Sequence, residues 1–516
     1  MGVEQFKDDV REGRIAAGRL VDLVVSLQRE LQAAKHQLDQ AKRRIEELEK
    51  KLGGSSTVKI AEPFSVRAEE RRQEARGKKR RTKKKNGRRG RITTAEKIAQ
   101  AARTEKVFPA GVLHDDCKLS HTRPDQPAVG ARRLEDGRAV LVAYEVYRGP
   151  KNQYGKIPGA LGRSEFGIEI VVAIAYLVYV VGLSFDKVCL LLNFFQNLTL
   201  RKSQADALLN QLSRHWEREF DTLCTLLANS AVVHSDETSW SINSVWVFLS
   251  EKVRVLFFGV HKDAETLKQI LDPETFAGIV VSDDAAVYAN FTHSQKCWAH
   301  LLRKAIKLTL LEPANEEYRQ LTDRLLEIYR QACRVQCDRR LGDAGRAKKV
   351  AGPTCGRCPD DEILKLCGPM WFAELPSSDG PADDYRLLAN ELMRLMLAEQ
   401  LFTFVTAAPV ETPTGEVVPV AGTNNEAERA LRSPAMDRKT GRTSKTPRGA
   451  RRRTVVVSVL ESLRQHLSTF TLSSVIDEIL CWSDAGTSCF ARLLATLQRS
   501  LPNKSLLDRL LPEPDG

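Results

Sequence analysis

The sequence predicts a multidomain α/β protein with a long helical insertion, and three observations lead to this prediction. A chain of 516 residues is too long for one ordinary domain and should form roughly three to four. Strand-like and helix-like segments alternate between residues 231 and 283, a pattern typical of a sheet covered by helices. Amphipathic helical patterns then occupy Glu317–Leu341 and Tyr385–Leu401.

An apolar repeat near the N-terminus predicts a coiled coil. Its residues follow one another in steps of three and four, and Gly53 and Gly54 end the helix. This spacing favours a homodimer or higher oligomer; a single amphipathic helix packed on its own chain is the alternative. The repeat consists of Leu20, Val24, Leu27, Leu31, Ala34, Leu38, Ala41, Ile45, Leu48 and Leu52.

The positive charge of the chain is concentrated in one segment. The chain has 79 Lys and Arg against 66 Asp and Glu, and Arg67–Arg91 alone holds fourteen basic and three acidic residues, a net charge of +11. Such a run is expected to lack fixed structure when free and to bind a polyanion. Lys78, Lys79, Arg80 and Arg81 are therefore predicted to contact DNA phosphates in a salt-sensitive manner. The alternative is a solvated linker.

The N-terminus has no apolar signal segment, so we expect a cytoplasmic protein whose eleven cysteines are reduced. The apolar stretch Ile170–Leu183 is shorter than the roughly 20 residues that span a bilayer, and it is predicted to be a buried helix rather than a membrane contact.

Two small units are predicted before the central strands. Residues 105–165 form a β-rich module, with a turn at Glu135–Arg138 and a strand at Val140–Tyr147. Residues 166–228 are helical, with a helix at Val188–Phe195 and a second at Ser203–Trp216 around a turn near Asn197. Two helices joined in this way fit a DNA-binding helix-turn-helix, although any helical hairpin has the same pattern.

Two acidic residues end apolar, strand-like runs. Asp236 follows residues 231–235 and Asp283 follows residues 278–282, in the order strand, strand, strand, helix, strand. A charged group at the end of a buried strand is costly unless it binds something. Two such carboxylates and a third acid could hold two Mg²⁺ (or Mn²⁺) ions, which prefer oxygen ligands. Ordinary strand-end caps remain the alternative.

The third acid comes from a capped helix start at residues 422–432. Glu426 and Glu428 lie about 200° apart on a helix, so only one can face the metal ions, and helix geometry leaves both open. Arg429 and Arg432 share a helix face and could clamp phosphates. A loop-like basic tract follows, for which DNA contact is favoured over a solvated surface; it contains Arg438, Lys439, Arg442, Lys445, Arg448 and Arg451–Arg453.

Four motifs in order resemble the transposases of the insertion-sequence 66 family. The resemblance runs from about Gly159 to Leu467, and the coiled coil and basic segment also resemble the family layout. It implies a ribonuclease H-like core with a DDE triad, interrupted by a helical insertion. By position, it selects Asp236, Asp283 and Glu428 as the catalytic metal ligands, in preference to Asp284 and Glu426. The motifs are His234–Trp240, Val281–Asp283 with Tyr288, Cys297–His300 and Asn424–Arg432.

Several cysteines, histidines and tryptophans stay outside the triad. His300 is predicted to contact phosphate or to support the site. The family commonly has paired cysteines near the start of the N-terminal module, where this chain has only Cys117, flanked by His114 and His121; these do not suffice for zinc. Cys333, Cys337, Cys355 and Cys358 could hold a structural zinc ion. Trp240, Trp246 and Trp298 are expected in the core rather than stacked on DNA bases.

The predicted function is metal-dependent cleavage of the ends of a mobile element, followed by strand transfer into target DNA. The alternatives are a nuclease of the same fold that does not join strands, and a DNA-binding regulator without activity. Expected partners are DNA and accessory proteins at the bacterial nucleoid, with no membrane partner. The expected segments are 1–52 (coiled coil), 53–104 (basic linker), 105–165 (β-rich module), 166–228 (helical), 229–310 (core, first part), 311–415 (helical insertion), 416–500 (core, second part) and 501–516 (tail).

Overall fold

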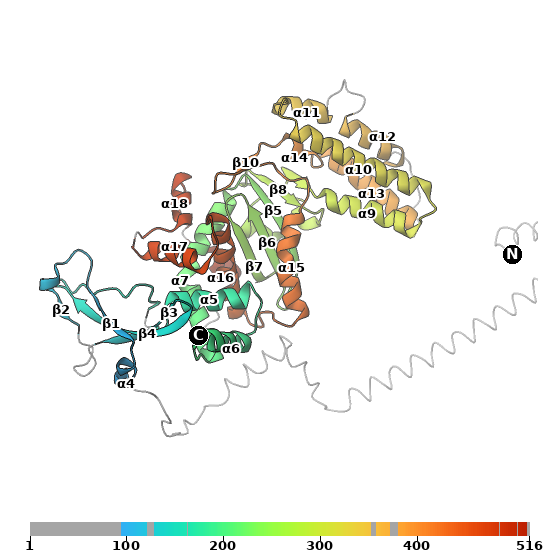
Figure 1. The fold of residues 1–516 in the computed structure, drawn as a ribbon. Coiled ribbons are helices and arrows are strands. Elements are labelled where there is room, and N and C mark those ends of the chain that lie inside the picture. The colour runs from blue at the N-terminus through green and yellow to red at the C-terminus, as the bar shows by residue number, and fades with distance from the viewer. Residues whose placement is uncertain are drawn as a thin grey trace, which may run out of the picture. The chain divides into compact units, whose positions relative to one another are not determined.

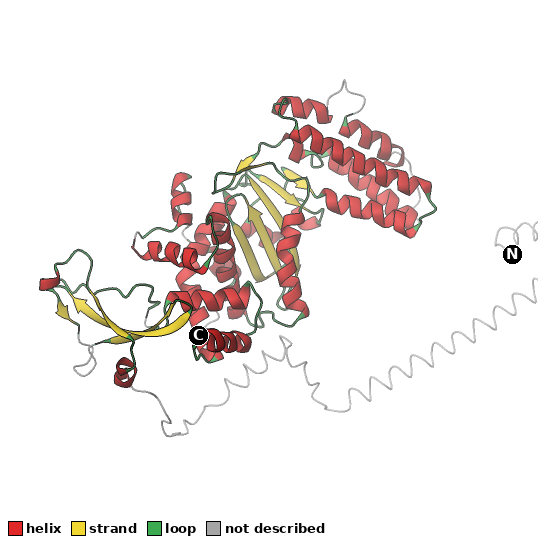
Figure 2. Ribbon diagram, in the orientation of Figure 1, coloured by secondary structure: helices red, strands yellow, loops and turns green. Residues whose placement is uncertain are grey.

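The computed structural model describes residues 94–120, 128–162, 164–351, 358–371, 380–484, 486–502 and 504–512. All of them belong to the unit Phe64–Gly516 (Figures 1 and 2). The predicted coiled coil and the basic run with Lys78–Arg81 lie outside the described residues. Sheets and many helices make up the described part, which confirms the mixed α/β class.

A four-stranded sheet forms where the β-rich module is predicted. It contains β1 (Arg103–Val107), β2 (Lys118–Leu119), β3 (Val129–Glu135) and β4 (Arg138–Arg148), and β4 pairs with the other three. Asp136 and Gly137 connect β3 to β4 with φ values of 47° and 75°. Two consecutive positive φ angles are the geometry of a tight hairpin turn. The short helix α4 (Thr94–Ala99) and the 3₁₀ turn η1 (His114–Asp116) flank these strands.

Three helices follow in the segment predicted to be helical: α5 (Ile168–Tyr179), α6 (Phe185–Gln196) and α7 (Lys202–Ala228). Ser184 caps α6 by accepting the amide hydrogen of Lys187, and Asn197 ends the helix at a φ of 54°. The second helix of the predicted pair continues past Trp216, because Phe220, Leu223 and Leu227 remain on its buried face. No described helix is both long and apolar enough to cross a bilayer.

The central sheet has five strands in the spatial order β7-β6-β5-β8-β9. In chain order they are β5 (Val232–Ser239), β6 (Ser244–Ser250), β7 (Arg254–Val260), β8 (Ile279–Ser282) and β9 (Ser294–Lys296). The first three are antiparallel, whereas β5, β8 and β9 run parallel. Helix α8 (Ala264–Ile270) lies between β7 and β8 in the chain, and the 3₁₀ turn η2 (Ala286–Tyr288) precedes β9. The predicted order of strand, strand, strand, helix and strand is confirmed, while β9 is an additional strand.

Helix α16 (Pro447–His466) covers the open edge of β7 through hydroxyl groups. Thr454, Ser458 and Ser462 each accept a β7 amide hydrogen, at 2.9 Å from Phe258 N, 2.9 Å from Leu256 N and 3.0 Å from Arg254 N. The hydroxyls recur every four residues of α16, a rise of about 6 Å, and the outward amides recur every two residues of β7, a rise of about 6.6 Å. Because the two spacings are similar, each hydroxyl meets one amide along the length of the contact. These three amides of the edge strand are therefore not free to pair with another chain.

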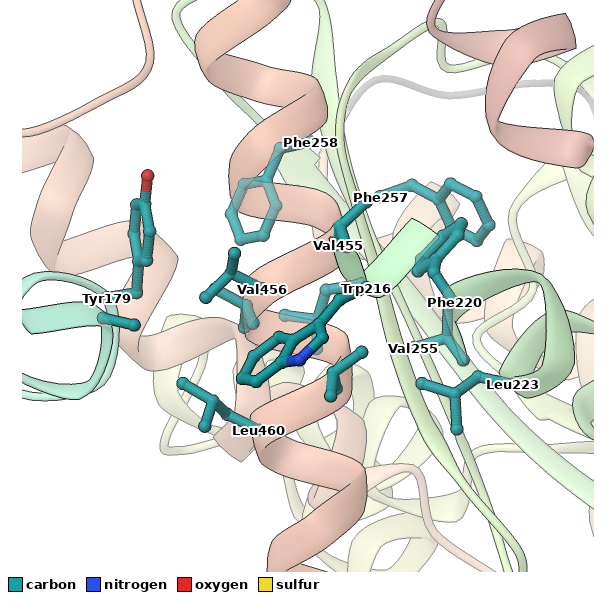
Figure 3. Packing of buried hydrophobic residues seen from close by; sticks show 14 of the residues in the cluster. Tyr179, Trp216, Phe220, Leu223, Val255, Phe257, Phe258, Val455, Val456 and Leu460 are labelled. Atoms are coloured by element: carbon teal, nitrogen blue, oxygen red, sulfur yellow. The ribbon is translucent and has the colours of Figure 1, made fainter. Parts of the chain in front are cut away.

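The main hydrophobic core lies between this sheet, α7 and α16. Trp216 of α7 lies beside Val456 and Leu460 of α16 (Figure 3). Phe220 packs edge-on against Phe257 of β7, with ring centres 5.5 Å apart. The remaining C-terminal helices are α15 (Asn425–Lys439), α17 (Leu472–Asp484), α18 (Cys489–Thr496) and α19 (Leu506–Leu510).

The helical insertion packs in a second core, to which the central sheet contributes Val232 of β5 and Ile279 and Val281 of β8. It contains α9 (Trp298–Leu311), α10 (Glu316–Cys337), α11 (Asp343–Ala351), α12 (Pro359–Trp371), α13 (Pro381–Leu397) and α14 (Thr403–Thr406), followed by the hairpin β10 (Val410–Glu411) and β11 (Val417–Val418). Its helices begin at Trp298 rather than at residue 311, because Trp298, Leu301 and Leu308 pack in this second core.

Candidate active site

Strand register brings Asp236 and Asp283 to the same level of the central sheet. His234 of β5 is paired with Val281 of the parallel strand β8, and each acid follows two residues later. Because side chains alternate along a strand, both acids project to the same side as the pair that precedes them. Asp236 lies within β5, which continues to Ser239, whereas Asp283 directly follows β8.

The Asp236 carboxylate lies in a partly buried, acidic environment and forms no ion pair among the described residues. Burial raises its pKa from 3.8 to about 7, and the negative charges of Glu237, Asp283 and Glu428 act in the same direction. The amide of Glu237, which donates to Asp236 Oδ1 over 2.8 Å, opposes this shift. Among the described residues, no lysine, arginine or histidine forms an ion pair with Asp236 or Asp283. Neither carboxylate is therefore neutralised by a direct ion pair, although Lys262 interacts electrostatically with both acids and Lys296 with Asp283.

Glu237 is buried and has its own partners. Tyr288 donates its hydroxyl to Glu237 Oε2 over 2.6 Å, and Lys262 Nζ lies 2.7 Å from Oε1. The Tyr288 oxygen also lies 3.2 Å from the hydroxyl of Ser235. These contacts hold the β5 segment around Asp236 in place. The Lys262 contact was not foreseen, since nothing in the sequence pairs a turn lysine with a strand glutamate.

Glu428 and Glu426 contact different elements, as their separation on a helix predicts. Arg303 Nη2 of α9 donates to both Glu428 oxygens, at 2.6 Å and 2.8 Å, and His300 Nδ1 lies 3.6 Å from Oε1. Glu426 instead accepts from Arg254 Nη2 of β7 at 2.6 Å. Of the two acids, only Glu428 is among the charges that raise the Asp236 pKa.

The fully buried Asn424 connects the sequence motifs to one another. Its side-chain nitrogen donates to the carbonyl oxygen of Ser235 over 2.8 Å, next to Asp236 in the chain. Its backbone amide donates to Cys297 Sγ over 3.0 Å, and the amide of Trp298 donates to Gly422 O. The start of α15 is thereby held against both β5 and the start of α9.

Two further charged groups surround Asp283. Asp284 is paired with Arg394 of α13, so its carboxylate is already neutralised. Lys296 of β9 is buried, and its Nζ lies 3.3 Å from both the backbone oxygen of Asp283 and the hydroxyl of Ser282. Burial lowers the Lys296 pKa. Sequence reasoning missed Lys296, and the only signal was a lysine in the strand that follows the second acid.

The residues predicted to bind DNA fall into two groups. Arg429, Arg432 and Lys439 are exposed on α15 and have no ion pair within the described residues. Arg438 donates to the Ser239 carbonyl over 2.9 Å, and Arg442 donates to the Gly182 carbonyl, so both also fix local structure.

The prediction of a loop is wrong for the last part of the basic tract. Arg451, Arg452 and Arg453 lie inside α16 rather than in a loop. They pair with acids of the fold: Arg451 with Glu217 and Asp508, Arg452 with Asp206, and Arg453 with Asp437. Their charge is thus used internally, and a DNA contact is no longer expected for them.

The predicted tryptophan role is confirmed, since Trp240, Trp246 and Trp298 are all buried. The structure does not test the predicted zinc site at the four cysteines of the insertion. Cys333, Cys337 and Cys358 do not come together as a metal-ligand group in the described structure, and Cys355 lies outside it. Zinc at these four cysteines stays a prediction.

Asp236→Asn is expected to stabilise the metal-free protein in a pH-dependent manner. A folded-state pKa of about 7 against an ordinary 3.8 means that ionised Asp236 opposes folding. The loss of folding stability begins as pH rises through 3.8, where Asp236 ionises in the unfolded chain, and is complete above about pH 7. Asparagine removes it, so the gain should grow from near zero at pH 4 to about 2–4 kcal/mol at pH 8. Thermal unfolding in a chelator measures it.

The exposed Glu265→Gln on α8 is a matched control without an expected pH-dependent gain. Added Mg²⁺ should reverse the order of stability, because only the parent chain keeps the full ligand set. A less stable Asp236→Asn chain at pH 8 without metal would contradict the interpretation.

Comparison with known proteins gives a family match over part of the chain. No curated protein matches the chain. Residues 163–352 match the model of the transposase IS66 family, a range that contains Asp236, Asp283 and His300, while Glu428 lies beyond it. The match agrees with the family that the sequence motifs resemble. Over residues 163–352, the chain therefore carries the domain of the IS66 transposase family.

Proposed function

We propose that this chain is a metal-dependent DNA transposase whose Asp236, Asp283 and Glu428 hold two Mg²⁺ (or Mn²⁺) ions. The observation that carries the proposal is the pair Asp236, on β5, and Asp283, directly after the parallel strand β8. Burial raises the Asp236 pKa to about 7, and neither acid has an ion-pair partner among the described residues. The strand order β7-β6-β5-β8-β9, antiparallel and then parallel, supports a ribonuclease H-like core.

The residues present fit hard divalent cations. Carboxylate oxygens are the ligands that Mg²⁺ prefers, and a cation would offset the burial and the acidic neighbours that raise the Asp236 pKa. When bound, two such ions supply activation of the attacking oxygen and stabilisation of the leaving oxygen at phosphorus. The chain itself contributes position: Lys296 holds the backbone of Asp283, and Asn424 holds the start of the Glu428 helix against β5.

Basic residues around this site would bind the DNA backbone. Arg429, Arg432 and Lys439 are exposed on the helix that carries Glu428, where phosphates could replace water around them. Lys78–Arg81 would add sequence-independent affinity, and the N-terminal heptad repeat would pair two chains and thus two element ends. These parts of the proposal extend the predictions made from the sequence.

Arg429→Ala/Arg432→Ala is expected to weaken the salt dependence of DNA binding. Each phosphate contact contributes about 0.9 to the slope of log affinity against log salt, so two lost contacts should flatten it by about 1.8. Fluorescence anisotropy with a labelled duplex at several salt concentrations measures the slope. Arg340→Ala, at an exposed position of the insertion, is the matched control. Equal slopes for the parent chain, the double variant and the control would mean that Arg429 and Arg432 of α15 do not contact DNA.

A strand-transfer assay tests the proposed function directly. The full chain is incubated with Mg²⁺, the linear DNA ends that flank its gene, and a supercoiled target plasmid. Joined products that disappear in a chelator are expected. Nicks without joining would favour the nuclease alternative, and DNA binding without cleavage would favour a regulator.

A further inference from the structure

A second set of potential metal ligands adjoins Glu428. Ligand atoms of Cys297, His300 and Glu428 all lie within 4.8 Å of one another, the one group of this kind in the part of the chain that the structure describes. Cys297 is the N-cap residue of α9, and His300 follows one turn later on the same helix. Glu428 comes from the first turn of α15. Two helices from distant parts of the sequence thus supply sulfur, nitrogen and oxygen donors.

The Cys297 sulfur is surrounded by backbone hydrogen-bond donors. The amide of Asn424 lies 3.0 Å from Sγ, and the amides of Ala299 and His300 also donate toward it. The sulfur is buried at the N-terminus of α9, where the helix dipole favours negative charge. These donors would stabilise a metal-bound thiolate, the form of cysteine that binds metal ions, whereas burial raises the pKa of the free thiol.

One ring nitrogen of His300 has no hydrogen-bond partner among the described residues. Its Nδ1 atom is buried without a hydrogen-bond partner and lies 3.6 Å from Glu428 Oε1. Two ligands about 2 Å from a tetrahedral ion are roughly 3.3 Å apart, so this separation suits a shared ion better than a direct hydrogen bond. A buried polar atom without a partner is uncommon and is explained if it binds an ion.

The ligand set opens onto a pocket of about 250 Å³. Cys297 and His300 line this pocket together with Asp283, Lys296 and Glu391. A fourth ligand, such as water, therefore has room on the side of Asp283. Arg303 contacts both Glu428 oxygens, but its side chain is half exposed. It can keep Oε2 while Oε1, the oxygen near His300, turns to an ion.

We propose that Cys297, His300 and Glu428 form a zinc site. Thiolate and imidazole ligands select Zn²⁺ over Mg²⁺, which prefers oxygen. Three protein ligands with one open position is a known zinc arrangement. The proposal goes beyond the proposed reaction, which uses oxygen ligands alone. Zinc here would fix α9 to α15 and so hold Glu428 beside Asp283; a carboxylate can bridge this ion and a neighbouring one.

Metal binding to the full-length protein tests this site. The parent for the test carries Cys333→Ser and Cys337→Ser, so that the separate cysteine cluster cannot contribute. After equilibrium dialysis against zinc, we expect about one zinc ion per chain by mass spectrometry. Cobalt in place of zinc should give a thiolate charge-transfer band in the near ultraviolet.

His300→Gln and Cys297→Ser should each weaken zinc affinity more than about 10-fold, because even outer partners of a metal site cost 10- to 100-fold. Cys297→Ser should also remove the cobalt band. Cys481→Ser, at an exposed cysteine of α17, should bind as the parent does. If Cys297→Ser does not fold, the zinc affinity of His300→Gln alone tests the site, because the His300 side chain is partly exposed and its replacement should be tolerated.

A parent chain without zinc, or unchanged affinity in the folded ligand variants, would overturn the proposal. These readouts need no DNA. Zinc binding without strand transfer would reject the proposed reaction alone, and strand transfer without zinc binding would reject this site alone.

Discussion

Asp236→Asn and Glu428→Gln are each expected to lower Mg²⁺-dependent DNA cleavage by about 1,000-fold or more. Each change replaces a ligand oxygen with a neutral amide nitrogen and keeps the shape of the side chain. A bound metal ion contributes several kcal/mol to the stabilisation of the transition state, and about 1.4 kcal/mol corresponds to a factor of ten in rate. Initial rates of end cleavage at saturating Mg²⁺ measure the effect.

Glu426→Gln and Asp284→Asn are matched controls, because each acid neighbours a triad member in the chain but contacts a different element. Glu426 contacts Arg254, and Asp284 contacts Arg394. Both variants should cleave within a few-fold of the parent chain. An inactive Glu426→Gln beside an active Glu428→Gln would move the third acid to Glu426. Cleavage by Asp236→Asn at the parental rate would reject the triad.

Much of the central sheet was predictable because its strands are apolar runs separated by polar turns. β5, β6, β7 and β8 have this pattern, and all four form. β9 has the polar sequence Ser-Gln-Lys and was not predicted. It is buried because Gln295 hydrogen-bonds the Leu401 carbonyl, more than a hundred residues away, and no local pattern encodes such a contact.

The candidate site was predictable where it depends on local geometry. Strand patterns led to the acids that follow the apolar runs of β5 and β8, and helix periodicity separated Glu426 from Glu428, whose partners do differ. The choice of Glu428 as the third acid comes from the family resemblance and stays a prediction. The partners themselves were not predictable. Arg303 meets Glu428 from 125 positions away, and a lone arginine in a helix carries no sign of that contact.

Charge counting failed for Arg451–Arg453 for a related reason. A run of arginines is the same in sequence whether it faces solvent or a buried acid. The side chains of Arg453 and Asp437 are only 5% and 7% exposed, and nothing in the sequence pairs these two residues. Exposed and internal basic runs are distinguished by the acids that fold against them, which here come from α7, α15 and α19.

Removing the three hydroxyls that cover β7, through Thr454→Val, Ser458→Ala and Ser462→Ala, is expected to destabilise the core by about 3–9 kcal/mol. All three residues are fully buried, and each hydroxyl accepts one β7 amide hydrogen. A buried amide left without an acceptor costs about 1–3 kcal/mol. Domain stability is only about 5–15 kcal/mol in total, so the triple variant should lie near the limit of folding. Urea unfolding followed by tryptophan fluorescence measures the loss.

Single variants separate the hydrogen bond from the packing around it. Thr454→Val keeps the shape but loses the hydroxyl, whereas Thr454→Ser keeps the hydroxyl and loses a methyl group. If the amide of Phe258 needs its acceptor, valine should be the more destabilising of the two. Ser473→Ala, at an exposed position on α17, should change stability by less than about 0.5 kcal/mol. A triple variant as stable as the parent would mean that β7 finds other acceptors, and α16 would then hold the sheet edge through apolar packing alone.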